Sequence, residues 1–347
     1  MLGFEWDPPE VHHRWNSASP GRLERCEIAV LDDAVLELRR VYSFALGLLV
    51  ELPATGNRAC DLFRVLRDAT ARVISLPQAP HADSAIRRPM LHLEVESVID
   101  ATASLTECLN RSPSGSTTNC FAVGHAHIDT AWLWPIRETR RKCLRSFSNQ
   151  LRLMEVFPDY RFLCSQAQQY AWVKEDSPEL FAAITSRVAE GRWEAHGAMW
   201  VEPDCNCPSG ESLVRQIVYG EQFWREHFGE AAPQRMLFLP DTFGFPATLP
   251  QIMAQAGLDT FVTNKLTWST SNIFPHTSFV WKGLDGSRVL AHNTPGQDYN
   301  AVNTPKELAR GEANHRTKSA APALWLQPFG YGDGGGGATE NLSLIHI

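Results

Sequence analysis

The sequence predicts an α/β protein, a seven-stranded parallel (β/α) barrel preceded by an all-helical region. Residues 22–110 place apolar side chains three or four positions apart, which is typical of amphipathic helices, and no strand pattern interrupts them. From residue 120 onward, short apolar runs alternate with amphipathic helical stretches, which indicates βα units and a parallel sheet. Polar side chains follow the ends of these runs, where the loops of such folds converge.

We expect the helical region to occupy residues 1–110. Its amphipathic stretches are LERCEIAVLDDAVLELRRVYSFALGLLVEL, CDLFRVLRDATARVISL and MLHLEVESVIDATASLTECL. The polar segment RSPSGSTTN, residues 111–119, is typical of a linker between domains. Residues 120–347 are then expected to form the α/β domain.

Seven strands are predicted in the α/β domain, and that number favours a closed barrel over an open sheet. They are CFAVG, RFLCS, RWEAHGAMW, RMLFL, TFVTN, RVLAH and ALWLQ. Helices between them include SPELFAAITSRVAEG and SGESLVRQIVYGEQFWREHFG, for which Ser177 and Ser209 are suitable N-caps.

Composition and charge exclude several classes of partner. The formal net charge of −7 gives no reason to expect binding to nucleic acid or to an anionic membrane. The most apolar stretch, Val41–Leu52, is too short to span a bilayer. The N-terminus lacks a secretory pattern, and eight scattered cysteines in a chain of this length suit reduced thiols, so we expect a cytoplasmic protein.

The segment GHAHIDTAWLW alternates potential metal ligands with apolar residues. On a strand, His125, His127 and Asp129 would share one face. At a strand end, His127 and Asp129 suit a divalent metal, most simply zinc, with His125 packed behind them. The alternative is a structural histidine followed by an aspartate that caps a helix.

Two further segments place acids near aromatic or glycine-rich surroundings. In MWVEPDCNCPSG, Asp204 is either a nucleophile kept ionised by a nearby dication or a loop residue that caps the next helix. Cys205 and Cys207 are better explained as buried thiols than as metal ligands. In GYGDGGGG, the glycines let the backbone approach a ligand around Asp333. Tryptophans near these acids, Trp132 among them, would suit stacking on a sugar.

These segments resemble the ordered motifs of glycoside hydrolase family 38, the α-mannosidases, in the branch of cytosolic, vacuolar and bacterial enzymes. The motifs are GHAHIDTAWLWP, WVEPDCNCPSGESLVRQ, LPDTFGFPATLPQI, NKLTWS with FPHTSFVWKGLDGSRV, and GYGDGGGG, and they span residues 121–337 in order. The resemblance implies a retaining hydrolase on a seven-stranded barrel, with one divalent ion that is zinc or cobalt.

The resemblance also implies roles for individual residues. The metal pair falls on His127 and Asp129, and the nucleophile, which also contacts the metal, falls on Asp204. The aromatic on which mannose stacks falls on Trp132. Asp241 is expected near sugar hydroxyls, and Asp333 is the candidate acid/base.

The chain ends soon after GDGGGGATEN, so we expect a fragment truncated at its C-terminal end. In the resembled family a further metal-ligating histidine lies downstream. We therefore expect residues 1–347 alone to bind zinc weakly, to show little activity and to associate through the surface that later domains would cover.

The function predicted is hydrolysis of terminal α-linked mannose from oligosaccharides or glycans, with Asp204 as nucleophile. The alternative is a metal-dependent amidohydrolase or deacetylase on a similar barrel, which also begins with H-x-H. Such an enzyme should show more histidines after its middle strands, where this chain has Asp204, Asp241 and Lys265. A non-catalytic sugar-binding module would need the aromatics without the acids.

Overall fold

The computed structural model describes residues 32–74, 95–111, 118–316 and 323–343. The predicted helical segments within residues 1–31 and 75–94 lie outside the described residues, as does most of the predicted linker. Among the described residues, no helix has the length and apolar character needed to cross a membrane.

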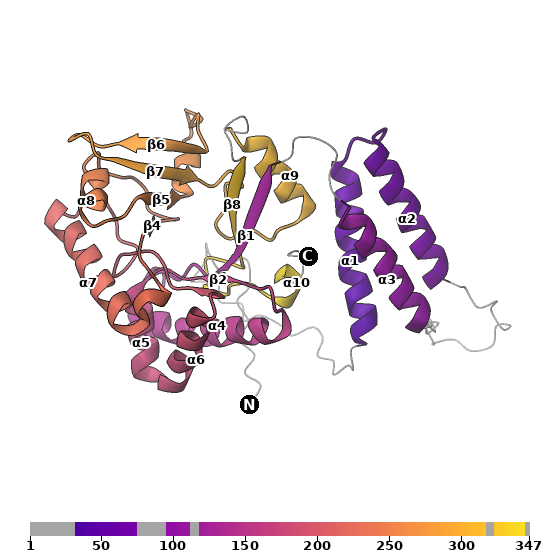
Figure 1. The fold of residues 1–347 in the computed structure, drawn as a ribbon, viewed down its shortest axis with the longest axis horizontal. Helices are drawn as coiled ribbons and strands as arrows, with labels where there is room; N and C mark the ends of the chain where they lie inside the picture. The colour runs from indigo at the N-terminus through magenta and orange to yellow at the C-terminus, as the bar shows by residue number, and fades with distance from the viewer. Residues whose placement is uncertain (1–31, 75–94, 112–117, 317–322, 344–347) are drawn as a thin grey trace, which may run out of the picture.

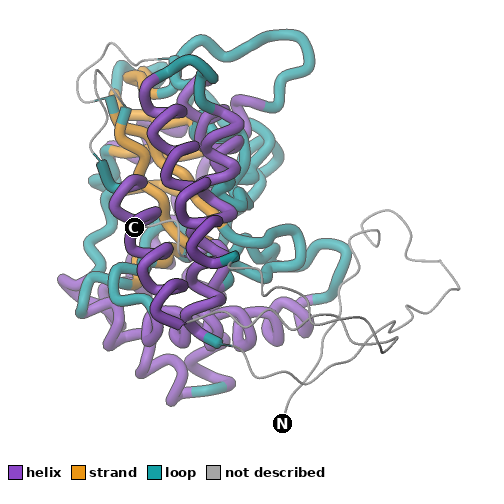
Figure 2. The backbone as a smooth tube through the Cα atoms, turned by 90° about the vertical axis from the view of Figure 1, so that its right-hand side faces the viewer, coloured by secondary structure: helices purple, strands orange, loops and turns teal. Residues whose placement is uncertain are grey.

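The first described part is a bundle of three helices, α1 (Asp33–Glu51), α2 (Asn57–Val73) and α3 (Val95–Leu109). Helix α1 begins where it does because the side chain of Asp32 accepts hydrogen bonds from the first backbone amides of the helix. The bundle buries a core of its own, which includes Leu38, Leu62, Val98 and Leu105. Figure 2 shows the three helices side by side in front of the strands.

The α/β part carries the remaining elements, most of them alternating strands and helices. The strands are β1 (Asn119–His125), β2 (Phe162–Leu163), β3 (Trp193–Glu194), β4 (Met236–Phe238), β5 (Thr260–Thr263), β6 (Ser278–Lys282), β7 (Arg288–Asn293) and β8 (Leu324–Phe329). The α-helices are α4 (Ile136–Val156), α5 (Ala167–Asp176), α6 (Pro178–Ala189), α7 (Gly210–Phe228), α8 (Leu249–Gln255), α9 (Pro305–Asn314) and α10 (Glu340–Ser343). Short 3₁₀ turns follow α7 (Gly229–Ala231) and β5 (Lys265–Thr267).

The strands form two four-stranded sheets, in the orders β3-β2-β1-β8 and β4-β5-β7-β6. Every recorded pairing is parallel except that of β6 with β7, so the predicted α/β class with a parallel sheet is confirmed. The seven parallel strands are the seven predicted ones, and the antiparallel edge strand β6 was missed. Among the described strands no ladder joins β3 to β4 or β7 to β8, so the closed barrel stays a prediction.

The two sheets nevertheless share an interior. Val123 and Leu163 from the first sheet pack against Phe238 and Val262 from the second. A larger cluster lies between the first sheet and helices α4 to α7, which in Figure 1 surround the lower and left sides of the strands. Burial on these faces determines which side chains of each strand point inward, and the loops after the carboxyl ends of the strands remain free to line a pocket.

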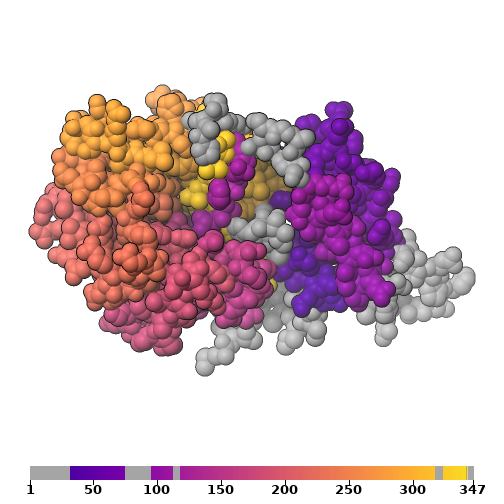
Figure 3. Space-filling view, in the orientation of Figure 1, coloured from indigo at the N-terminus to yellow at the C-terminus, as the bar shows by residue number. Residues whose placement is uncertain are grey.

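The bundle packs beside the α/β part, as the space-filling view of Figure 3 shows. Helix α1 contacts α9, and the guanidinium of Arg40 donates a hydrogen bond of 3.2 Å to Glu340 in α10. None of these contacts reaches the pocket described below.

Candidate active site and metal centre

A pocket of about 690 Å³ opens where loops from both sheets meet. The loops that follow β1, β4 and β5 each contribute side chains to it, as does the glycine-rich segment after β8. The pocket is lined by every acid and aromatic that the sequence predicted as catalytic, metal-binding or substrate-binding: Asp129, Trp132, Asp204, Asp241 and Asp333. The histidine His127 lines it as well.

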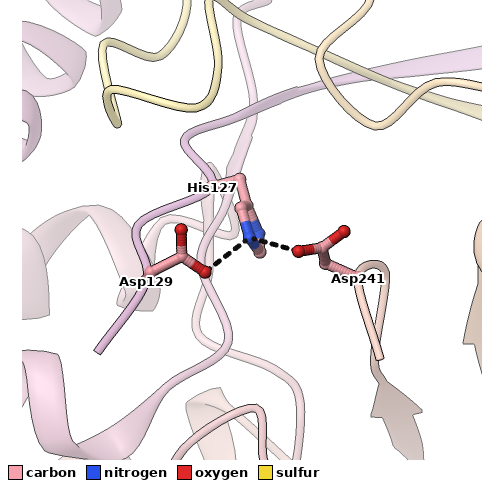
Figure 4. A group of neighbouring side chains, drawn as sticks. All are labelled: His127, Asp129 and Asp241. Carbon is pink, nitrogen blue, oxygen red and sulfur yellow. Dashed lines mark hydrogen bonds and ion pairs between the residues drawn. The ribbon is translucent and has the colours of Figure 1, made fainter. Parts of the chain in front are cut away.

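At the centre of the pocket, His127 lies between two carboxylates (Figure 4). Its Nε2 is 3.2 Å from Asp129 Oδ1 and 3.4 Å from Asp241 Oδ2. One nitrogen or oxygen atom of each of these three residues lies within 4.8 Å of the others, so they could hold a metal ion together.

The segment after β1 is shaped by bonds to its backbone. The strand ends at His125, but the alternation continues, because Ala126 and Ile128 are buried in the main core while His127 faces the pocket. The carbonyl of Ile128 accepts hydrogen bonds from the amides of Gln166 and Gln169, at 2.9 and 2.6 Å. These bonds fix the position of His127 and Asp129 on either side of Ile128.

His125 lies deeper, as predicted for a packed residue. Its Nδ1 is 3.0 Å from the carbonyl oxygen of Leu163, and its ring packs edge-on against Phe238 at 5.3 Å. Burial and the neighbouring His127 lower the pKa of His125 to about 3, although the bond to Leu163 opposes this shift. His125 is therefore a neutral side chain in the interior.

The charges around His127 are strongly coupled. Burial opposes the protonated imidazolium, but the carboxylates of Asp129, Asp241 and Glu202 outweigh it and raise the pKa of His127 to about 10. Burial alone would raise the pKa of Asp241, yet His127, Lys265 and Tyr299 lower it to about 2. The site therefore favours a positive charge on His127 and keeps Asp241 ionised.

Asp241 has more partners than the sequence predicted. Lys265 Nζ is 2.5 Å from Asp241 Oδ1, and the hydroxyl of Tyr299 donates to the same oxygen at 2.7 Å. The ammonium of Lys265 also lies 3.2 Å from the centre of the Trp268 ring. These contacts leave Asp241 Oδ2 directed toward His127, the position of a metal ligand.

Asp204 lines the pocket but does not belong to the three-residue group. Its carboxylate accepts hydrogen bonds from the backbone amides of Asn206 (3.2 Å) and Cys207 (2.8 Å). These bonds lower the pKa of Asp204, so its carboxylate is ionised at neutral pH. The turn explains the difference from the predicted metal contact, because it directs the carboxylate toward its own loop.

Trp132 and Asp333 lie on other walls of the pocket. The Trp132 side chain is 47% exposed and packs edge-on against Trp134 at 5.3 Å. The Asp333 carboxylate accepts a hydrogen bond of 3.3 Å from Asn300. Gly332 is required at this point, since a Cβ there would lie 1.7 Å from the Asn300 side chain.

Sequence reasoning missed Glu202, a buried acid in the same loop as Asp204. Burial raises the pKa of Glu202 to about 7, although His127 opposes that shift. The signal was present in WVEPD, where Glu202 stands two positions before Asp204. Tyr299 and Gln166 carried no comparable signal.

The residues present fit a divalent cation. The carboxylates of Asp129, Asp241 and Glu202 all lie within ion-pair distance of His127. Among the described residues, the only other cationic side chain that pairs with any of the three is Lys265, which contacts Asp241. One imidazole nitrogen with carboxylate oxygens is a donor set that suits zinc or a similar transition metal.

Comparison with known proteins extends this picture. The family model described as "Glycosyl hydrolases family 38 N-terminal domain" matches residues 117–346. The chain is 44% identical over 243 residues to Alpha-mannosidase G of Dictyostelium discoideum, which covers 69% of this chain and 22% of that protein. It is 48% identical over 222 residues to human Alpha-mannosidase 2C1, which covers 64% of this chain and 21% of the relative.

A solved structure shares the fold. The crystal structure of an alpha-mannosidase from Enterococcus faecalis V583 matches with a TM-score of 0.52 at 21% identity, over 64% of this chain and 26% of that one. The chain thus spans about a fifth to a quarter of the length of the proteins it matches. With a family model that covers residues 117–346, the chain belongs to glycosyl hydrolase family 38.

Proposed function

We propose that this chain forms the core of the active site of a retaining, metal-dependent α-mannosidase that removes terminal α-linked mannose from oligosaccharides or glycans. The observation that carries the proposal is the convergence of His127, Asp129 and Asp241 in a pocket that also contains Trp132 and Asp204. The names of its relatives, Alpha-mannosidase G and Alpha-mannosidase 2C1, support the substrate class.

A divalent ion, zinc in the first instance and cobalt as a second possibility, would be held by His127, Asp129 and Asp241. When bound, the ion polarises sugar hydroxyls and stabilises the charge that develops as the ring distorts. The predicted ligation by Asp204 remains part of the proposal, and it requires that carboxylate to exchange its bonds to Asn206 and Cys207 for the ion.

Asp204 is the proposed nucleophile. The hydrogen bonds from Asn206 and Cys207 lower the pKa of its carboxylate, and a dication that replaced them would also keep it ionised, as attack requires. A carboxylate oxygen forms a bond to the anomeric carbon while the bond from that carbon to the leaving oxygen breaks, and Asp333 gives its proton to the leaving oxygen. Water then attacks the same carbon, Asp333 takes a proton from the water, and Asp204 is released as a carboxylate.

Trp132 is the proposed floor for the mannose ring. Trp132 is about half exposed and lines the pocket, so it can offer an apolar face to the C–H groups of a sugar. The acids opposite it can accept hydrogen bonds from the hydroxyls. This combination favours a carbohydrate over an acyl amide.

The test is an assay of the longest natural form of the chain with p-nitrophenyl α-mannoside, with a panel of acyl amides as controls. Both are measured after chelation and again after addition of zinc or cobalt. We expect mannoside turnover that depends on metal and a product with retained α configuration by ¹H NMR. Amide hydrolysis without mannoside turnover would favour the amidohydrolase alternative, and inverted configuration would contradict the nucleophilic role of Asp204.

A further inference from the structure

Glu202 lies on the face of His127 that points away from Asp129 and Asp241. Its Oε2 is 3.5 Å from His127 Nδ1, whereas both metal-site carboxylates lie beside Nε2. The two side chains are almost fully buried, with 4% of His127 and 8% of Glu202 exposed. The imidazole therefore has one nitrogen toward the proposed ion and one toward a buried carboxylate.

The two facing atoms have no other partner in the described part of the chain. His127 Nδ1 and Glu202 Oε2 are both buried without a hydrogen bond. Buried polar atoms of this kind are costly unless they are paired. Each of these two atoms can serve as the polar partner of the other, because they lie within ion-pair distance.

Neighbouring side chains hold Glu202 in this orientation. The hydroxyl of Ser165 donates to the other carboxylate oxygen, Oε1. The backbone amide of Glu202 donates to Gln166 Oε1 at 3.3 Å, and Gln166 also binds the carbonyl of Ile128 next to His127. Gln166 thus links the backbone of Glu202 to the backbone beside His127 through hydrogen bonds.

A histidine can bind a metal through Nε2 only when its proton is on Nδ1 or absent. A carboxylate beside Nδ1 stabilises the proton there, fixes the ring and makes the other nitrogen a better ligand. We propose that Glu202 is a positioning residue that holds the Nδ1–H of His127 and so presents Nε2 to the metal. This inference rests on the metal site of the proposed function.

The substitution Glu202→Gln tests the contact with almost no change in volume. Ser165 would still donate to an oxygen, so the amide oxygen occupies the Oε1 position and the amide nitrogen faces His127. An NH₂ group there donates to Nδ1 and favours the proton on Nε2, where it competes with the ion. We expect zinc affinity to fall about 10- to 100-fold.

The variant Glu202→Asp separates position from charge. It keeps the negative charge but withdraws the carboxylate by one methylene, beyond reach of Nδ1. If Glu202 acts by contact, zinc affinity falls in this variant as well. If it acts only as a charge, the affinity stays at the wild-type value, which would overturn the proposal.

The matched control is Glu194→Gln, since Glu194 forms another Glu–His pair, 3.0 Å from His196, and does not line the pocket. Zinc dissociation constants would be measured on residues 1–347 by competition with a chromophoric chelator at pH 7, together with thermal unfolding of the metal-free proteins. A purely structural role would lower the unfolding temperature without a selective effect on zinc affinity.

Should both Glu202 variants fail to fold, Ser165→Ala provides the second route. It removes the hydrogen bond that orients the Glu202 carboxylate but keeps the carboxylate itself. We expect a smaller loss of zinc affinity there, and unchanged affinity would contradict the proposal. A wild-type chain that binds no zinc at all would instead contradict the proposed metal site, so the two failures are distinguishable.

Discussion

Asp204 and Asp241 each follow a proline at the end of a strand region, yet their carboxylates have different partners. Asp204 accepts two amides of its own loop, whereas Asp241 contacts His127, Lys265 and Tyr299. The first arrangement keeps an anion available to the pocket, and the second holds an oxygen beside an imidazole. Two residues in the same sequence context are therefore suited to attack and to ligation.

At this scale we predict that Asp204→Asn abolishes turnover of α-mannosides, at least 10³-fold, because an amide cannot form the glycosyl ester. The control is Asp285→Asn, which removes a carboxylate that likewise accepts bonds from its own turn, at Ser287, outside the pocket. Both should cost stability slightly, but only the first should affect kcat. Near-normal kcat in Asp204→Asn would exclude it as the nucleophile.

The sequence could indicate which acids reach the pocket but not how they are oriented. His127, Asp129, Asp204, Asp241 and Asp333 were found because strand ends converge in parallel folds. The sequence did not predict that Asp241, and not Asp204, contacts His127. This arrangement depends on Lys265 and Tyr299, which come from segments distant in sequence. Glu202 was missed because its neighbour Asp204 fitted the expected pattern.

At the scale of elements, β6 and the seam between β7 and β8 were outside the reach of sequence patterns. Strand β6 is a partly exposed edge strand without clear alternation of buried and exposed residues. At the seam, the amide of Leu326 in β8 donates to His292 Nε2 at 3.2 Å, and His292 Nδ1 is 2.9 Å from the Ser278 hydroxyl. One side chain thus connects three strands where no ladder is recorded between β7 and β8.

We predict that His292 makes stability depend on pH. Burial and the nearby His315 lower the pKa of His292 to about 4, from an ordinary value of 6.5. The unfolded chain therefore binds a proton first, so the free energy of unfolding falls as pH drops from about 6.5 to about 4, by up to about 3 kcal/mol. Above pH 6.5 this contribution is constant.

The measurement is urea unfolding of wild type and His292→Gln between pH 7 and pH 4. The variant should be about 1–3 kcal/mol less stable at pH 7, because Leu326 and Ser278 lose their partner, and its pH dependence should be flatter. His276→Gln, at an exposed histidine before β6, is the control and should follow the wild type. Equal slopes in all three proteins would refute the assignment to His292.

At the scale of the whole molecule, the bundle and the α/β part have separate cores. The bundle core contains residues from α1, α2 and α3, and the other clusters contain only residues from Ala122 onward. The periodicity of residues 22–110 was sufficient to predict these helices, because each buries one face. Closure of the barrel could not be predicted in the same way, since it depends on contacts such as His292 that join distant strands.

We therefore predict that damage to the bundle core leaves the metal site intact. Leu62 in α2 is fully buried, so Leu62→Ala should destabilise the bundle by about 2–5 kcal/mol. Zinc affinity of the folded protein at 10 °C should stay within twofold of wild type. A tenfold loss of affinity would show that the bundle supports the pocket, contrary to the separation of the cores.

The most direct test of the account is the position of the metal ion, measured by anomalous scattering at the zinc edge from crystals grown with zinc. We predict one strong peak about 2.0–2.2 Å from His127 Nε2 and from one carboxylate oxygen each of Asp129 and Asp241, with an oxygen of Asp204 at the same distance once it has exchanged its loop bonds for the ion. A zinc peak at other side chains, with no anomalous peak beside His127, would contradict the account.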